Sequence, residues 1–297
     1  MSPSESPAGL PAAGGPGVFD RLRAVPVIRL GGMAIAALGM RETVDLMIEA
    51  AQASPRPGRP LYMTSANGEV LSRHARSPDF ARLFVTADLV NADGQPMVLL
   101  SRWLGARALP ERVATTDLFH GVAREAAARG LSFYLFGASE DENRRAVENV
   151  QALYPSLRIV GRSHGYLTGE ALSDTLDQID ALAPDILWLA LGVPREQAFV
   201  HEHGARLAHV GIIKTSGGLF NFLSGSRTRA PAWMQRAGLE WAWRLRQEPI
   251  RLFWRYAVTN PHAIGLMLAH GRSGALTRGT GRLVRALLPS RTPLVRR

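Results

Sequence analysis

Short, almost entirely apolar segments recur along the first two thirds of this chain, and each leads through a polar or glycine-containing turn into a helical pattern. The clearest examples are residues 61–64, 131–136, 185–191 and 210–214. Strands that are apolar at nearly every position are typical of a parallel sheet that helices cover on both faces. The sequence therefore predicts an α/β fold with such a sheet.

The turns that follow these strands carry the residues expected to form a site. In parallel sheets of this kind, ligands bind beyond the carboxyl ends of the strands. The residues that fall at those ends are Ser65, Asn67, Asp93, Gly94, Gly137, Gly192, Pro194, Glu196, Gln197, Gly217 and Gly218. Glycines there allow backbone N–H groups to approach phosphates, although no dinucleotide-binding or P-loop pattern is present.

Two of the polar groups have a structural as well as a functional interpretation. Asp93 and Gly94 are a common turn pair, but a carboxylate at a strand end can also act as general base towards a hydroxyl group. Arg112, Thr116 and Asp117 form either the capped start of a helix, with Thr116 or Asp117 as N-cap, or a polar group that binds a ligand.

Charge divides the chain at Gly225. From there to the end it has 14 Arg and no Lys against Glu240 and Glu248, a balance of +12, so the total of +10 leaves −2 for residues 1–224. The same stretch holds four of the six tryptophans. We expect a disordered leader over residues 1–25, a catalytic core over 26–224, a basic helical appendage over 225–262, and over 263–297 a basic tail whose composition is compatible with disorder.

The appendage has an amphipathic pattern with two interpretations. Its apolar positions are Met234, Trp241, Leu245, Leu252 and Tyr256, and its basic positions include Arg236, Arg244, Arg251 and Arg255, with a helix break at Pro249. Such a helix either packs on the core with a solvated basic side or lies on a membrane, with arginines on phosphates and tryptophans at the interface.

Other features limit the compartment and the cofactors. The chain has no cysteine, so disulfides and thiolate metal sites are impossible, and a reducing compartment is indicated. Neither a secretory signal nor an uncharged apolar run of the roughly 18–20 residues that a spanning helix needs is visible. No Asp-x-Asp metal-binding pattern occurs, and we expect neither a metal nor another cofactor.

The chain resembles the WecG/TagA/CpsF glycosyltransferases over roughly residues 25–260. The residues that carry this resemblance are 229–241, Arg244, Leu245, 247–249, Arg255 and Tyr256 in the appendage, and Asn67, Asp93, Gly94, 111–113, Asp117, Leu118, 164–166, 192–194 and Phe220 before it.

The resemblance implies a Rossmann-like core and an inverting transfer of sugar from a UDP donor to a polyprenyl-diphosphate-linked sugar, in the biosynthesis of surface polysaccharides. It implies a metal-independent enzyme attached peripherally to the inner face of the cytoplasmic membrane. Asp93 is then the base, while Arg227, Arg229 and Arg236 are expected to bind diphosphate, and backbone N–H groups at Gly192 or at Gly217 and Gly218 to stabilise the leaving UDP. The donor sugar, the acceptor sugar and the oligomeric state stay open.

Four departures from the family's patterns leave other hypotheses in play. Ser65 replaces a threonine, Glu196 and Gln197 exchange acid and amide, Thr115 replaces a glycine, and Asn221 replaces an aspartate. A catalytically impaired scaffold that binds UDP or a membrane is one alternative. A nucleic-acid-binding protein is another, but the basic charge is confined to one arm and no nucleic-acid-binding motif is present.

Overall fold

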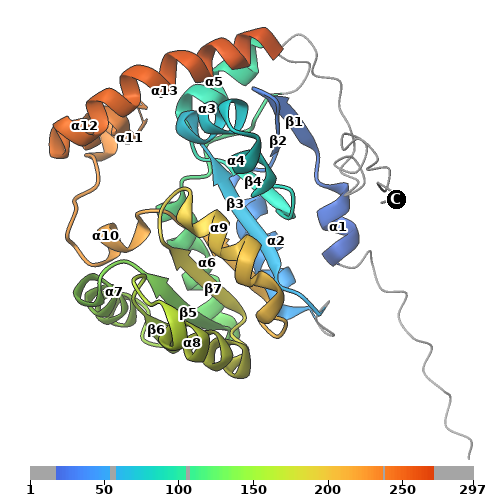
Figure 1. Cartoon of the computed structure of the whole chain (residues 1–297), viewed down its shortest axis with the longest axis vertical. Coiled ribbons are helices and arrows are strands. Elements are labelled where there is room, and N and C mark those ends of the chain that lie inside the picture. Colours follow the sequence, from blue (N-terminus) through green and yellow to red (C-terminus); the bar gives the residue numbers. More distant parts are fainter. Residues whose placement is uncertain (1–17, 54–57, 105–107, 237, 271–297) are drawn as a thin grey trace, which may run out of the picture.

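The computed structural model describes residues 18–53, 58–104, 108–236 and 238–270. Its centre is a sheet of six strands, all parallel, in the order β4-β3-β8-β7-β5-β6 (Figure 1). The strands are β3 (Leu61–Ala66), β4 (Leu89–Ala92), β5 (Ser132–Gly137), β6 (Arg158–Ser163), β7 (Ile186–Ala190) and β8 (Ile212–Thr215). The predicted parallel, Rossmann-like sheet covered by helices is confirmed.

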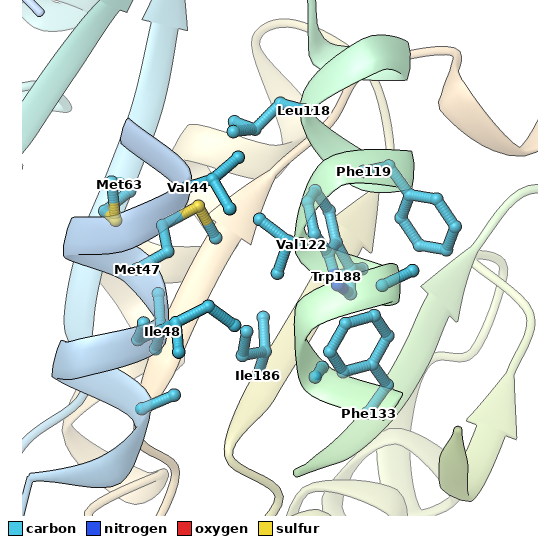
Figure 2. Packing of buried hydrophobic residues seen from close by; sticks show 14 of the residues in the cluster. Val44, Met47, Ile48, Met63, Leu118, Phe119, Val122, Phe133, Ile186 and Trp188 are labelled. Carbon is cyan, nitrogen blue, oxygen red and sulfur yellow. The ribbon is translucent and has the colours of Figure 1, made fainter. Parts of the chain in front are cut away.

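Alternating side chains divide the core between the two faces of the sheet. Phe133 and Trp188 point to the face covered by α2 (Met40–Gln52), α6 (Thr115–Arg129), α7 (Glu140–Leu153) and α10 (Leu219–Leu223). On this face Phe119 of α6 packs against Trp188 with 4.9 Å between ring centroids (Figure 2). The opposite face lies against α8 (Gly169–Leu182) and α9 (Arg195–His203), which a short 3₁₀ turn, η1 (Gly204–Arg206), follows.

A third cluster joins the amino-terminal hairpin to the end of the described chain. The antiparallel strands β1 (Val27–Leu30) and β2 (Met33–Ala36) pack with α3 (Gly68–Arg76), α4 (Pro78–Arg82), α5 (Gln95–Leu104) and α13 (Pro249–His270). The long helix α13 crosses α3 and α5 (Figure 1). Ala263 and Met267 of α13 are almost completely buried in this cluster, so the appendage is part of the folded body.

The predicted appendage ends later in the structure than expected, and the predicted leader ends earlier. After α11 (Ala232–Arg236) and α12 (Glu240–Gln247), α13 continues through Pro261 to His270, beyond the predicted boundary at 262. Burial of Ala263 and Met267 explains this extension. At the other end, α1 (Val18–Ala24) lies inside the stretch predicted to be disordered, so that prediction was wrong for its residues. Residues 1–17 and 271–297 lie outside the described residues.

Two local expectations also change. The N-cap of α6 is Ala114, so neither Thr116 nor Asp117 caps that helix. Strand β6 was not expected from the sequence because it is an edge strand with only partly buried residues, and therefore lacks the continuous apolar pattern of the central strands.

Candidate active site

A cleft of about 830 Å³ lies at the carboxyl ends of the central strands, and α12 and α13 form one of its walls. It brings together many of the residues that the sequence places at strand ends. The predicted residues that line it are Ser65, Asn67, Asp93, Gly94, Arg112, Thr116, Gly192, Glu196, Gly217, Gly218 and Arg227. The grouping of these residues in one cleft makes it the candidate active site.

Other predicted residues lie outside the lining of the cleft. Gly137 has φ +140°, and a Cβ there would lie 2.2 Å from the carbonyl oxygen of Ala190, which indicates a packing requirement. Pro194 precedes the first turn of α9, and Gln197 is fully buried with its amide donating to Thr64 at 3.4 Å. Asp117 pairs with Arg229, and neither lines the cleft. The side chain of Arg236 lies outside the described residues.

Asp93 follows β4 directly and is held from two sides. Its backbone N–H donates to Ala66 at the end of β3 at 2.8 Å, which fixes the turn against the central strands. Arg112 Nε donates to its Oδ1 at 3.2 Å, and Thr115 Oγ1 donates to its Oδ2 at 3.1 Å. Thr115, which was not among the predicted site residues, therefore contacts the carboxylate. One indication of this role was present in the sequence, namely that Thr115 directly precedes Thr116 at the start of α6.

Arg112 also binds the appendage. Its Nη1 donates at 2.7 Å to Glu240, the first residue of α12, whose other oxygen lies 3.8 Å from Arg229 Nε. Burial opposes the charged form of Arg112, but the carboxylates of Asp93 and Glu240 outweigh burial and raise the pKa of the guanidinium. An ion-pair chain thus runs from Asp93 through Arg112 to Glu240 and Arg229. Glu240 was not among the predicted site residues.

The geometry can be compared with known proteins. Residues 28–275 match the model of the "Glycosyl transferase WecG/TagA/CpsF family". This chain belongs to that family. Two curated relatives, from Bacillus spizizenii and Bacillus subtilis, are both named N-acetylglucosaminyldiphosphoundecaprenol N-acetyl-beta-D-mannosaminyltransferase. The first is 29% identical over 222 residues, 75% of this chain and 84% of the relative. The second is 29% identical over 202 residues, 67% of this chain and 75% of the relative.

In this glycosyltransferase the appendage presents arginines to the cleft. Arg227 lines it and pairs with Glu248 at 2.8 Å. Arg255 lines it and pairs with Glu69 at 3.0 Å, while Arg244 lies 6.0 Å from the centroid of the Phe222 ring. No ion pair of Arg244 occurs within the described part of the chain. Arg244 and Arg255 were expected on a basic helix face, and the fold turns them towards the cleft.

The carboxylate of Glu196 accepts a hydrogen bond from Gly217, one of the backbone N–H groups expected from the sequence to face a phosphate. Its Oε2 accepts the Gly217 N–H at 2.8 Å. Glu196 is 3% exposed, and burial raises the pKa of its carboxyl group. In this structure an internal anion therefore binds the Gly217 N–H, and the expected stabilisation of a leaving group by Gly192 or Gly218 stays a prediction.

No group of three or more His, Cys, Asp or Glu side chains that could hold a metal ion occurs among the described residues. The charged residues that line the cleft of this glycosyltransferase are the carboxylates Glu69, Asp93, Glu142, Glu196 and Glu240 and the guanidinium groups of Arg112, Arg227, Arg244 and Arg255. A carboxylate for proton transfer therefore lies in one cleft with cationic groups suited to a diphosphate.

Proposed function

We propose that this glycosyltransferase moves a sugar from a UDP-sugar to a polyprenyl-diphosphate-linked sugar, with inversion, in the biosynthesis of surface or exopolysaccharides. The observation that carries the proposal is Asp93 in the cleft, held by Arg112 and Thr115 and facing arginines from the appendage. The names of both curated relatives describe transfer of a sugar to an undecaprenyl-diphosphate-linked acceptor, which supports the same acceptor class here.

In the proposed reaction Asp93 is the general base. It accepts the proton of the acceptor hydroxyl group while that oxygen bonds to the anomeric carbon and the bond from this carbon to UDP breaks. The Arg112 and Thr115 contacts occupy one direction at each carboxylate oxygen. Each oxygen has a second lone pair, so one of them can still take the proton. Arg112 and Thr115 thus orient the carboxylate.

The negative charge that develops on the leaving UDP requires cationic partners. Arg227, Arg244 and Arg255 line the cleft. Guanidinium groups bind diphosphate oxygens through charge-assisted hydrogen bonds, often in pairs. Arg244 is the best placed for this role, because Arg227 and Arg255 also bind Glu248 and Glu69.

We expect transfer to proceed without a divalent metal, because the sequence has no Asp-x-Asp pattern and arginines line the cleft. Product formation should be unchanged within about twofold after treatment with excess EDTA and gel filtration. The measurement is the initial rate with and without added Mg²⁺ or Mn²⁺. A rate that EDTA abolishes and either ion restores would contradict this expectation.

The outward side of α13 supports peripheral attachment to the inner face of the cell membrane. Ile250, Phe253, Trp254, Val258 and Leu268 are all exposed on it, and Ile250 is 87% exposed. Arg255, which was expected on a basic face, turns towards the cleft, and the exposed side chains named above are all apolar. Within the described residues, no helix is long and apolar enough to cross a membrane. An exposed apolar stripe on a basic appendage fits an interfacial helix.

Replacing Ile250, Phe253 and Trp254 by Ser should weaken binding to vesicles that contain anionic lipid by at least about tenfold, because each side chain buries apolar surface in the bilayer. Co-sedimentation at low salt measures the change. The matched control replaces Leu153 and Leu182, exposed residues at the ends of α7 and α8, by Ser. The control should bind as the unchanged protein does. Equal binding by all three proteins would refute attachment through α13.

The proposed reaction is tested by incubating the full chain with a panel of UDP-sugars and an N-acetylglucosamine acceptor on a polyprenyl diphosphate, with products identified by mass. One donor should give an acceptor larger by one sugar residue. Binding of UDP without any transfer across the panel would favour the impaired-scaffold alternative.

A further inference from the structure

Lys214 is the only lysine in this sequence, where every other Lys or Arg position holds arginine. It lies in β8 at the centre of the sheet, paired with Met63 of β3 and Trp188 of β7, and its side chain is 0% exposed. Burial of an ammonium group is costly unless the group is paired and hydrogen-bonded. A lone lysine at such a place therefore requires an explanation from its contacts.

The contacts of Lys214 determine the direction of one hydroxyl proton. Its Nζ donates to Ser65 Oγ at 2.9 Å and to the carbonyl oxygen of Thr215 at 2.9 Å. An ammonium group has three donors and no acceptor, so Ser65 Oγ must be the acceptor in this bond. The Ser65 hydroxyl proton is then free to point elsewhere, and no second partner of this oxygen occurs among the described residues. Ser65 lines the cleft, which is where that proton can be donated.

We propose that Lys214 is a positioning residue that directs the Ser65 hydroxyl proton to an oxygen of the donor's diphosphate. The inference rests on the proposed function, because it assumes a nucleoside-diphosphate donor in this cleft. Ser65 lies at the carboxyl end of β3, next to β8, where ligands of parallel sheets bind. The buried ammonium group behind it also favours an anionic partner over a second cation.

Lysine suits this position better than arginine. The site accommodates a single donor atom between Ser65 Oγ and the Thr215 carbonyl oxygen, in a fully buried place beside Trp188. A guanidinium group is planar and larger, and its fixed fork of donors cannot replace one ammonium nitrogen without displacing its neighbours. Lys214→Arg should therefore fail to restore the function that Lys214→Met removes.

The ammonium group of Lys214 loses its proton in a pH range in which binding can be measured. Burial lowers the pKa of its ammonium group to about 8, although the carboxylates of Glu196 on α9 and Asp93 after β4 oppose the decrease. Below that pH the ammonium group can only donate. Above it, the neutral amine can accept a hydrogen bond, so the Ser65 proton can turn inward and leave the cleft. The effect of Ser65 should therefore be present below pH 8 and be lost as the pH rises through that value.

A double-mutant cycle tests the inference on the full chain. Ser65→Ala and Lys214→Met should each weaken UDP binding and lower kcat/KM by about 10- to 100-fold, the range for a lost hydrogen bond to a charged group. If Lys214 acts through Ser65, the double variant should be no worse than the poorer single variant. Losses that multiply in the double variant would overturn the proposal. Thermal unfolding of all four proteins separates lost folding from lost positioning.

The pH dependence supplies a readout that does not depend on folding of the Lys214 variant. In the unchanged protein, UDP affinity should decrease above about pH 8, and Ser65→Ala should show a smaller decrease, because it retains only the direct attraction between the Lys214 charge and the anion. The same decrease in both proteins would refute the role of Ser65. If the unchanged protein transfers sugar but the losses of the two single variants multiply in the double variant, only this inference is refuted. UDP binding without sugar transfer refutes only the proposed function, and absence of UDP binding refutes both the function and this inference.

Discussion

Asp93→Asn is expected to lower the turnover number by about 10²- to 10⁴-fold, the range for loss of a general base. The amide cannot accept the proton of the attacking hydroxyl group, yet it has the same shape, its oxygen can still accept from Arg112, and its NH2 group can donate to the Thr115 hydroxyl oxygen. UDP affinity should therefore change little, while the free energy of unfolding should decrease by no more than for Glu240→Gln, because Arg112 likewise loses one of its two carboxylate partners. The measurements are the initial rate of sugar transfer, UDP affinity by calorimetry, and thermal unfolding of both proteins.

Thr115→Val serves as the graded control for this experiment. It removes one hydrogen bond to Asp93 but leaves the carboxylate and the Arg112 contact in place. We expect a decrease of about tenfold, because a single hydrogen bond orients the base and does not replace it. Turnover by Asp93→Asn within tenfold of the unchanged protein would remove Asp93 from the role of base, and another carboxylate of the cleft would then have to be considered.

Glu240→Gln is expected to lower the turnover number by about 10- to 100-fold and the free energy of unfolding by about 1.5–3 kcal/mol, the range for a hydrogen bond between charged groups. Glu240 anchors α12 to the core through Arg112, which in turn holds Asp93. An uncharged partner leaves the Arg112 guanidinium, largely enclosed by protein, with one carboxylate instead of two. The Asp93 carboxylate and the nearby wall of the cleft should then lose their fixed positions.

The matched control is Glu248→Gln, which alters the other acidic residue of the appendage. Glu248 pairs with Arg227 at 2.8 Å, whereas Arg112 pairs with Asp93 and Glu240. It should cost a similar free energy of unfolding but less activity than Glu240→Gln. Equal losses of activity would mean that Glu240 acts only by holding the appendage in place. Point substitutions are preferable here to deletion of the appendage, which would uncover Leu252, Ala263 and Met267, all buried.

The sequence by itself determined the sheet and the position of the cleft. Central parallel strands are buried on both faces, so their apolar runs mark β3, β5, β7 and β8 directly. Because all carboxyl ends of such strands meet at one edge, Ser65, Asp93 and Gly217 could be grouped without knowledge of the strand order. Edge strand β6 was not found, because its partly exposed residues lack that pattern.

Only the tertiary structure decided which charges face each other. Arg112 and Glu240 are 128 positions apart, and their ion pair exists because the fold brings the first residue of α12 to the loop that precedes α6. The same docking turns Arg244 and Arg255 towards the cleft and leaves an apolar stripe outside, which the helical period alone could not orient. Glu196 binds the Gly217 N–H, and Lys214 fixes Ser65, through contacts between different elements. A sequence pattern records the local period and the residue type, whereas hydrogen-bond partners depend on how distant elements pack.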